Sequence, residues 1–283
     1  MKLMRVGPAG QEKPVLLSDD GQHLDLSPIT PDINAEFWSA GRLVEVRRAV
    51  AAGTLKTVDV TGQRVGAPIA RPSAVLCIGL NYAAHAAESG VPTPTVPILF
   101  YKSPNTVVGP YDDIHLPRRS TKTDWEVELG VVIGARASYL ESRAEAERVI
   151  GGYVVSNDVS ERDFQLEESG GQWSKGKSCA TFNPVGPWLV TPDELDDPQG
   201  LGLKTWVNGE LRQDSNTADM VFGVADIILH LSQYTVLEPG DLITTGTPEG
   251  VALSGRFAYL RAGDRVELEI EGLGRQRSLC IDA

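Results

Sequence analysis

Two runs in the middle of the chain have the alternation expected of β-strands. Residues 125–133 read Trp-Glu-Val-Glu-Leu-Gly-Val-Val-Ile, and residues 153–156 form a second β-rich run that ends just before Asp158. Side chains of a strand alternate between its two faces, so Glu126 and Glu128 share one face. The apolar continuation of the first run indicates a buried strand. A buried strand does not display two carboxylates without a partner for them.

Elsewhere the pattern predicts short strands and few helices. Strands are expected at residues 15–17, 23–26, 74–79, 97–102, 241–245 and 265–271, and helices at about 43–53, 83–90, 140–150 and 224–234. Proline-rich residues 65–72 favour an extended boundary segment. We therefore predict a small N-terminal α/β domain, residues 1–70, and a main domain, residues 71–283. The expected fold class is α+β, mainly β.

Composition places the chain among ordinary globular proteins. Its 283 residues are 41% hydrophobic, with 26 basic against 38 acidic residues and a formal net charge of -12 at pH 7. That charge disfavours phosphate backbones and anionic lipids as partners. No run approaches the ~20 apolar residues of a membrane-spanning helix, and the first residues lack an apolar signal segment. We therefore expect a cytoplasmic protein with neither nucleic-acid nor membrane partners.

Three carboxylates form a candidate metal site. Glu126 and Glu128 share a strand face, and Asp158 follows the next β-rich run. Carboxylate oxygens suit a hard divalent cation such as magnesium. The three cysteines and four histidines are too scattered for a zinc-type or histidine-rich site. The pattern alone leaves the question open, because residues 265–271 alternate in the same way and are expected to form a half-exposed strand with a solvated acidic face.

The helix expected at about residues 83–90 carries a second candidate. His85 and Glu88 are three residues apart and face the same way. A carboxylate beside an imidazole fixes its tautomer and raises its basicity, which suits a general base that acts on water. A solvated pair on a surface helix has the same spacing, so both interpretations stay open. The proline-rich residues 91–95 that follow favour a mobile lid.

Five motifs occur in order along residues 73–283. They are Gly79-x-Asn81-Tyr82-x-x-His85-x-x-Glu88, Trp125-Glu126-x-Glu128-Leu129, Ser156-Asn157-Asp158-Val159-x-x-Arg162-Asp163-x-Gln165, Gly176-Lys177-Ser178 and Thr245-Gly246-Thr247-Pro248-x-Gly250. Together they resemble the fumarylacetoacetate hydrolase family. The leading 70 residues resemble the N-terminal domain of one bacterial branch of that family, which is similar to the 2,4-diketo-3-deoxy-sugar-acid hydrolases.

The resemblance implies a mixed β-roll catalytic domain wrapped around a metal, and commonly a homodimer. The implied ligands of Mg²⁺ or Mn²⁺ are Glu126, Glu128 and Asp158, and the implied catalytic residues are His85, Glu88 and Lys177. Positions that contact a 2-oxo acid substrate in the family fall on Arg162, Gln165 and Thr247, with Tyr101 and Lys102 as further candidates. Lys175 also flanks Gly176, and Lys177 is preferred because it directly precedes the serine.

The implied reaction is cleavage of a C–C bond in a 2,4-dioxo acid of the acylpyruvate type. The metal would chelate the 2-oxo acid, His85 would activate water for attack on C4, and pyruvate and a carboxylic acid would leave. Members of the family also decarboxylate oxaloacetate, isomerise or hydrate 2-oxo diacids, or act as ureidoglycolate lyases, and the sequence leaves these reactions open. An inert binding protein on the same scaffold is disfavoured, because the metal, dyad and lysine positions all persist.

Overall fold

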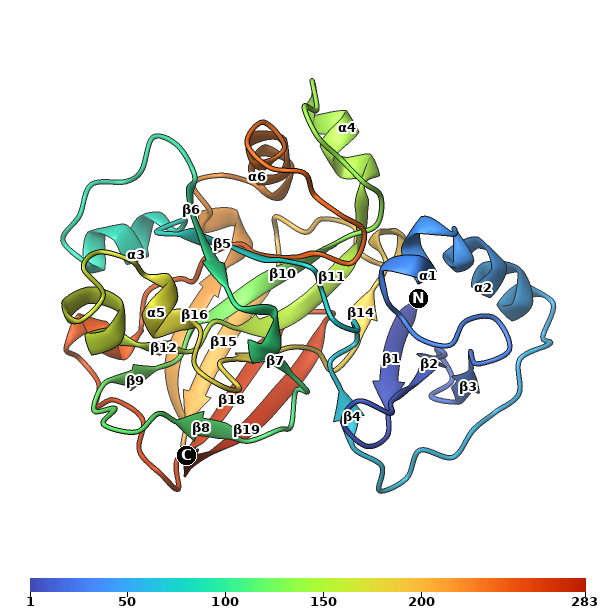
Figure 1. Ribbon diagram of the computed structural model, residues 1–283, viewed down its shortest axis with the longest axis horizontal. Coiled ribbons are helices and arrows are strands. Elements are labelled where there is room, and N and C mark those ends of the chain that lie inside the picture. Colours follow the sequence, from blue (N-terminus) through green and yellow to red (C-terminus); the bar gives the residue numbers. More distant parts are fainter.

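The computed structural model describes all 283 residues, and the chain is mainly β (Figure 1). The larger of two main sheets has ten strands in the order β3-β2-β1-β14-β11-β10-β17-β5-β6, with β4 paired to β1. Its strands are β1 (Lys2–Val6), β2 (Lys13–Leu17), β3 (His23–Asp25), β4 (Val65–Gly66), β5 (Val75–Gly79), β6 (Ile98–Lys102), β10 (Val127–Ile133), β11 (Ile150–Asn157), β14 (Leu189–Val190) and β17 (Leu242–Thr244).

The second sheet has five strands in the order β16-β15-β18-β19-β8. They are β8 (Ile114–Leu116), β15 (Gly202–Val207), β16 (Glu210–Asn216), β18 (Arg265–Ile270) and β19 (Gly274–Asp282). Two small pairs complete the β structure: β9 (Thr123–Asp124) with β12 (Ser160–Glu161), and β7 (Val107–Val108) with β13 (Asn183–Pro184). The expected α+β, mainly β fold with a mixed β-roll is confirmed.

Helices are few and short. They are α1 (Ala35–Ser39), α2 (Arg42–Ala51), α3 (Ala83–Glu88), α4 (Arg143–Arg148), α5 (Ser174–Lys177) and α6 (Val224–Leu231), with 3₁₀ turns η1 (Pro104–Thr106), η3 (Pro192–Glu194), η4 (Thr217–Asp219) and η5 (Ala252–Ser254) and a π-helical turn η2 (Asp163–Glu167). The four predicted helices are confirmed, each shorter than expected, while α1 and α5 were not predicted. No helix combines the length and the apolar character that crossing a bilayer requires.

Strand β10 lies between two hydrophobic cores. Trp125, Val127 and Leu129 belong to a cluster of 33 buried residues that also includes side chains of the second sheet. Val132 points the other way, into a cluster of 17 buried residues. The alternation predicted for this segment is therefore confirmed. Strand β18, with the same acidic alternation, keeps its glutamates on a partly exposed face, as predicted.

The leading residues add strands to the main sheet. The strands expected at residues 15–17 and 23–26 are present and form a hairpin, with Leu17 paired to His23 across β2 and β3. The strands of this segment join the larger sheet, because β1 pairs with β14 through Leu3 and Leu189. In Figure 1 this blue segment and its two helices lie at one end of the molecule, and α3 and α5 lie at the other. The division of the chain at residue 70 stays a prediction.

Candidate active site

The three predicted carboxylates meet at one end of β10 and β11. The antiparallel register pairs Glu128 with Ser156, and the Asp158 N–H donates to the Glu126 carbonyl oxygen at 3.0 Å. One carboxylate oxygen from each acid lies within 4.8 Å of the other two, and all three residues are buried. The start of β10 and the end of β11 thus gather acids that lie about 30 residues apart along the chain.

Three cations surround two of these acids. The Lys177 Nζ donates to Glu126 Oε2 at 2.6 Å and to Asp158 Oδ2 at 2.9 Å. Lys102 also donates to Asp158, and the Arg162 guanidinium lies 2.7 Å from Glu126 Oε1. Burial raises the pKa of Glu126, but the charges of Lys177 and Arg162 outweigh it and lower the pKa to about 2. Glu126 is therefore ionised near neutral pH.

Glu128 is the acid without a cation. The ion pairs of the cluster go to Glu126 and Asp158, whereas Glu128 Oε2 accepts the Gly246 N–H at 2.7 Å. Burial raises the pKa of Glu128 well above its ordinary value, and the charges of Asp158 and Glu126 raise it further. A divalent cation here would offset that negative charge. Because every donor is a carboxylate oxygen, the residues fit a hard cation such as Mg²⁺ or Mn²⁺.

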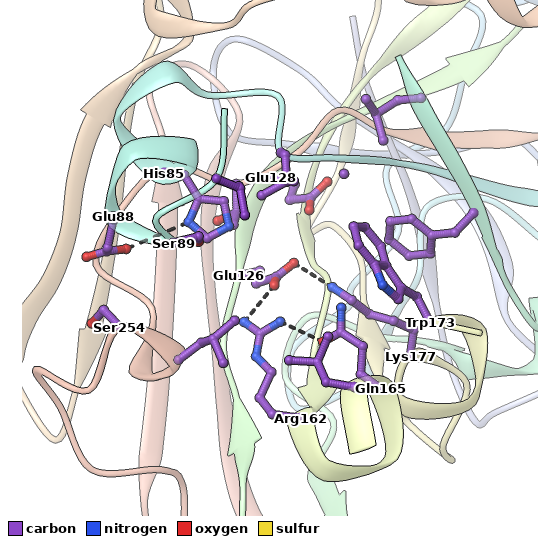
Figure 2. A pocket seen from close by; sticks show the side chains of 18 residues that line it. His85, Glu88, Ser89, Glu126, Glu128, Arg162, Gln165, Trp173, Lys177 and Ser254 are labelled. Carbon is purple, nitrogen blue, oxygen red and sulfur yellow. Dashed lines mark hydrogen bonds and ion pairs between the residues drawn. The ribbon is translucent and has the colours of Figure 1, made fainter. Parts of the chain in front are cut away.

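His85 and Glu88 lie on α3 and line a cavity of about 360 Å³ together with Glu126 and Glu128 (Figure 2). His85 Nδ1 is 3.7 Å from Glu88 Oε2, which is longer than a hydrogen bond, and the two side chains are only 7% and 11% exposed. Such burial rules out a solvated pair on a surface helix. In unliganded sites catalytic hydrogen bonds are often long and shorten when substrate binds.

Glu88 is held in place by a second segment of the chain. It accepts the Gly250 N–H at 3.1 Å and pairs with Arg256. Burial raises the pKa of Glu88, but His85, the Gly250 N–H and Arg256 outweigh it and lower the pKa overall. Glu88 is therefore an ionised carboxylate beside the imidazole. That arrangement can orient the imidazole ring.

Predicted substrate contacts divide into two groups. Arg162, Gln165 and Thr247 line the cavity, and Arg162 Nη1 donates to Gln165 Oε1 at 2.9 Å. Lys102 is buried and faces the carboxylates, whereas Tyr101 is 43% exposed and lies outside the lining. Neighbouring residues of strand β6 point to opposite faces of the sheet. Only one of the two can therefore reach the cluster.

Asp124 links the arginine to the cavity wall and was not anticipated. Its Oδ2 accepts from Arg162 Nε and from the Leu253 N–H, both at 2.9 Å, and its Oδ1 accepts the Ala252 N–H at 2.8 Å. Leu253 lines the cavity, so this single carboxylate fixes both a cation and a wall segment. The contact spans 128 residues. Its position directly before Trp125 is the only local signal.

Trp173 was likewise not anticipated as a residue of the site. Its indole packs over Gly79, where a Cβ atom would lie 2.4 Å from Trp173 Cζ3. Glycine at this motif position is therefore required for the indole to pack there. The Phe100 ring meets the indole edge-on, with centroids 5.6 Å apart, and Lys177 Nζ lies 5.2 Å from the Phe100 centroid. An aromatic wall thus stands beside the lysine.

A buried three-carboxylate cluster and a buried His–Glu pair in one cavity are the features of an enzyme site for a small molecule. The chain belongs to the fumarylacetoacetate hydrolase family, because residues 74–279 match the family described as "Fumarylacetoacetate (FAA) hydrolase C-terminal". This finding confirms the resemblance that the motifs carry. A relative from Burkholderia multivorans, provisionally named a hydrolase with no stated substrate, is 50% identical over 282 residues, covering 99% of this chain and 98% of its own.

Solved structures of two kinds of enzyme share the fold over the whole chain. A 5-carboxymethyl-2-hydroxymuconate delta-isomerase from Mycobacterium smegmatis is 32% identical, with a TM-score of 0.79, and the match covers 100% of this chain and 99% of that one. A maleylpyruvate hydrolase from Sphingobium sp. SYK-6, solved with manganese(II) and pyruvate, is 26% identical, with a TM-score of 0.81 and full coverage of both chains. Both hydrolases and isomerases therefore use this scaffold.

Proposed function

We propose that this enzyme is a metal-dependent hydrolase that cleaves the C–C bond of a 2,4-dioxo acid, of the acylpyruvate type, to pyruvate and a carboxylic acid. The main observation in support of this proposal is that one cavity is lined both by acids of the three-carboxylate cluster and by the buried His85–Glu88 pair. Hydrolysis of such a bond requires a site for the 2-oxo acid and a base for water. The cavity has candidates for both.

Mg²⁺ or Mn²⁺ at the cluster would supply Lewis-acid activation of the 2-oxo group. His85 takes a proton from the water that attacks C4, and Glu88 stabilises the imidazolium. The electron pair of the C3–C4 bond passes to C3, where protonation completes pyruvate. Burial lowers the pKa of Lys177, but Asp158 and Glu126 outweigh it and raise the pKa overall. Lys177 therefore stays protonated and stabilises the negative charge that develops.

Two further observations bear on this proposal. The maleylpyruvate hydrolase from Sphingobium was solved with manganese(II) and pyruvate, which supports the cation and the product. The delta-isomerase from Mycobacterium smegmatis supports a second candidate, isomerisation of an unsaturated 2-oxo diacid at the same cluster. Isomerisation needs no attacking water. Reaction products therefore separate the two candidates, as they separate both from decarboxylation and ureidoglycolate cleavage.

The test is a product analysis with protein loaded with Mg²⁺ or Mn²⁺. Acylpyruvates, oxaloacetate, ureidoglycolate and an unsaturated 2-oxo diacid are incubated separately, and pyruvate, CO₂, glyoxylate and double-bond migration are each measured. We expect pyruvate and a carboxylic acid from acylpyruvates, at rates that exceed all other conversions and vanish in EDTA. Failure to release pyruvate from any acylpyruvate with either cation would contradict the proposal. The homodimer stays a prediction, which light scattering checks.

A further inference from the structure

The cavity is larger than the reacting part of a 2,4-dioxo acid. Its volume is about 360 Å³. At roughly 30 Å³ per water-sized group, such a volume holds on the order of twelve groups. Pyruvate has half that number of non-hydrogen atoms, so space remains for an acyl group of about six more. The residues that line this space decide which acyl groups fit.

Apolar side chains from separate elements face this cavity. Phe100 and Trp173 form the aromatic wall, and Leu166 on η2 and Val91 after α3 line the cavity with them. Leu166 and Val91 are 44% and 39% exposed, so both present apolar surface that no other part of the chain covers. A hydrocarbon group in the cavity would cover them and would gain the free energy of removing apolar surface from water.

The cavity offers no free cation to a second substrate carboxylate. Arg162 pairs with Asp124 and Glu126, and Lys177 pairs with Glu126 and Asp158. Arg256, beyond the lining, pairs with Glu88. The lining also contains three acids, so a carboxylate at the far end of the substrate would be buried without a partner. Such burial is strongly unfavourable.

Hydroxyl groups would also find few partners. Most neutral polar side chains in the lining already form hydrogen bonds: Gln165 accepts from Arg162 (2.9 Å), Thr247 donates to the Val127 carbonyl oxygen (2.9 Å) and Ser254 donates to the Val251 carbonyl oxygen (2.7 Å). The Ser89 hydroxyl and the Gln165 Nε2 group remain available. A chain with several hydroxyls would therefore lose hydrogen bonds to water that the cavity does not replace.

We propose that the group beyond C4 of the substrate is an uncharged hydrocarbon of about four non-hydrogen atoms, which with C4 and its oxygen make up the acyl group, rather than a carboxylate-bearing or polyhydroxylated chain. This inference rests on the proposed function for the identity of the reacting end. The specificity contacts are the apolar surfaces of Phe100, Trp173, Leu166 and Val91.

The test uses three 2-oxo acids with the same six-carbon chain: 2-oxohexanoate, 2-oxoadipate and 6-hydroxy-2-oxohexanoate. Binding to the Mg²⁺-loaded protein is measured by calorimetry, so turnover is not required. We expect 2-oxohexanoate to bind about 10-fold or more tightly than either of the others, because only its end group matches the lining. Tighter or equal binding of 2-oxoadipate or the hydroxy acid would overturn the inference. Failure to cleave acylpyruvates would contradict the proposed function while leaving this order of affinities to decide the inference.

A matched pair of variants locates the effect. Leu166→Arg places a cation in the lining and is expected to shift the 2-oxoadipate to 2-oxohexanoate affinity ratio by about 10-fold toward 2-oxoadipate. Leu211→Arg is the control, since Leu211 on β16 is 46% exposed and lies outside the cavity. It should leave the ratio unchanged. Equal ratios in the two variants would overturn the assignment of Leu166 to the specificity wall.

Discussion

Asp124→Asn tests whether one carboxylate organises the arginine and the wall beside it. Oδ2 of Asp124 accepts from Arg162 and Leu253, and Oδ1 accepts from Ala252. Asparagine has nearly the same shape but replaces one oxygen by an NH₂ donor. In either orientation that donor faces an N–H group. The substitution therefore removes a buried charge and leaves at least one buried donor without an acceptor.

The expected cost follows from these contacts. Hydrogen bonds to charged groups contribute about 1.5–3 kcal/mol each, and breaking a buried ion pair from one side costs about 3–5 kcal/mol. Arg162 keeps its second partner, Glu126, which limits the loss. We expect the free energy of unfolding to fall by about 3–5 kcal/mol, a large share of the 5–15 kcal/mol typical of a folded protein. The melting temperature should fall by on the order of 10 °C.

Urea unfolding followed by circular dichroism, with metal removed by EDTA, measures this loss. Asp214→Asn is the control, because Asp214 pairs with Lys204 at 3.4 Å and its side chain is 50% exposed. Such a surface pair contributes about 0–1 kcal/mol. A loss below about 1 kcal/mol in Asp124→Asn, or equal losses in both variants, would refute the reasoning that Asp124 holds the arginine and the wall together.

Three further predictions concern the site and the stability of the fold. His85→Ala should lower acylpyruvate hydrolysis about 10²-fold or more and oxaloacetate decarboxylation less. The control His230→Ala, which removes a ring tilted against Tyr234, should change neither activity. Equal losses of the two activities in His85→Ala would contradict water activation. Glu126→Gln should weaken Mn²⁺ binding about 10-fold or more in calorimetry, and Glu269→Gln on β18 should not; identical titrations would contradict the site. Burial raises the pKa of Glu12, but its backbone and arginine partners lower it overall. The ionised Glu12 therefore stabilises the fold above the ordinary glutamate pKa, and this contribution is lost as pH falls through the lowered pKa. In urea unfolding, the difference in stability between wild type and Glu12→Gln should therefore decrease from about pH 5 to pH 3. A difference that does not change with pH would contradict this.

The local sequence pattern was sufficient to predict the features that depend on a single strand. The alternation around Glu126 and Glu128 predicted their common face, and the same rule separated Trp125 and Val127 onto the other. The same alternation rule could also have excluded one of two predicted substrate contacts in β6. Tyr101 and Lys102 are neighbours in β6, so they could not both face the carboxylates.

The remaining features depend on contacts between distant segments. Asp124 meets the amides of residues 252 and 253, and Trp173 packs over Gly79, so neither partner is visible in a local window. The pairing of β1 with β14 in the interior of the larger sheet is of the same kind, since two residues of β14 decide it. Periodicity identifies the faces of an element, but it does not identify what covers them.

The core shared between the leading unit and the main sheet constrains how this enzyme can evolve. Leu3, Phe37 and Trp38 pack in the same buried cluster as Val132 and Val154, on the strands whose ends carry the acids. A lineage could not lose or exchange the first 70 residues as it would an appended module, because the loss would expose one buried face of β10 and β11 to water. Substitutions in the leading unit and in these strands should therefore be inherited in compensating sets.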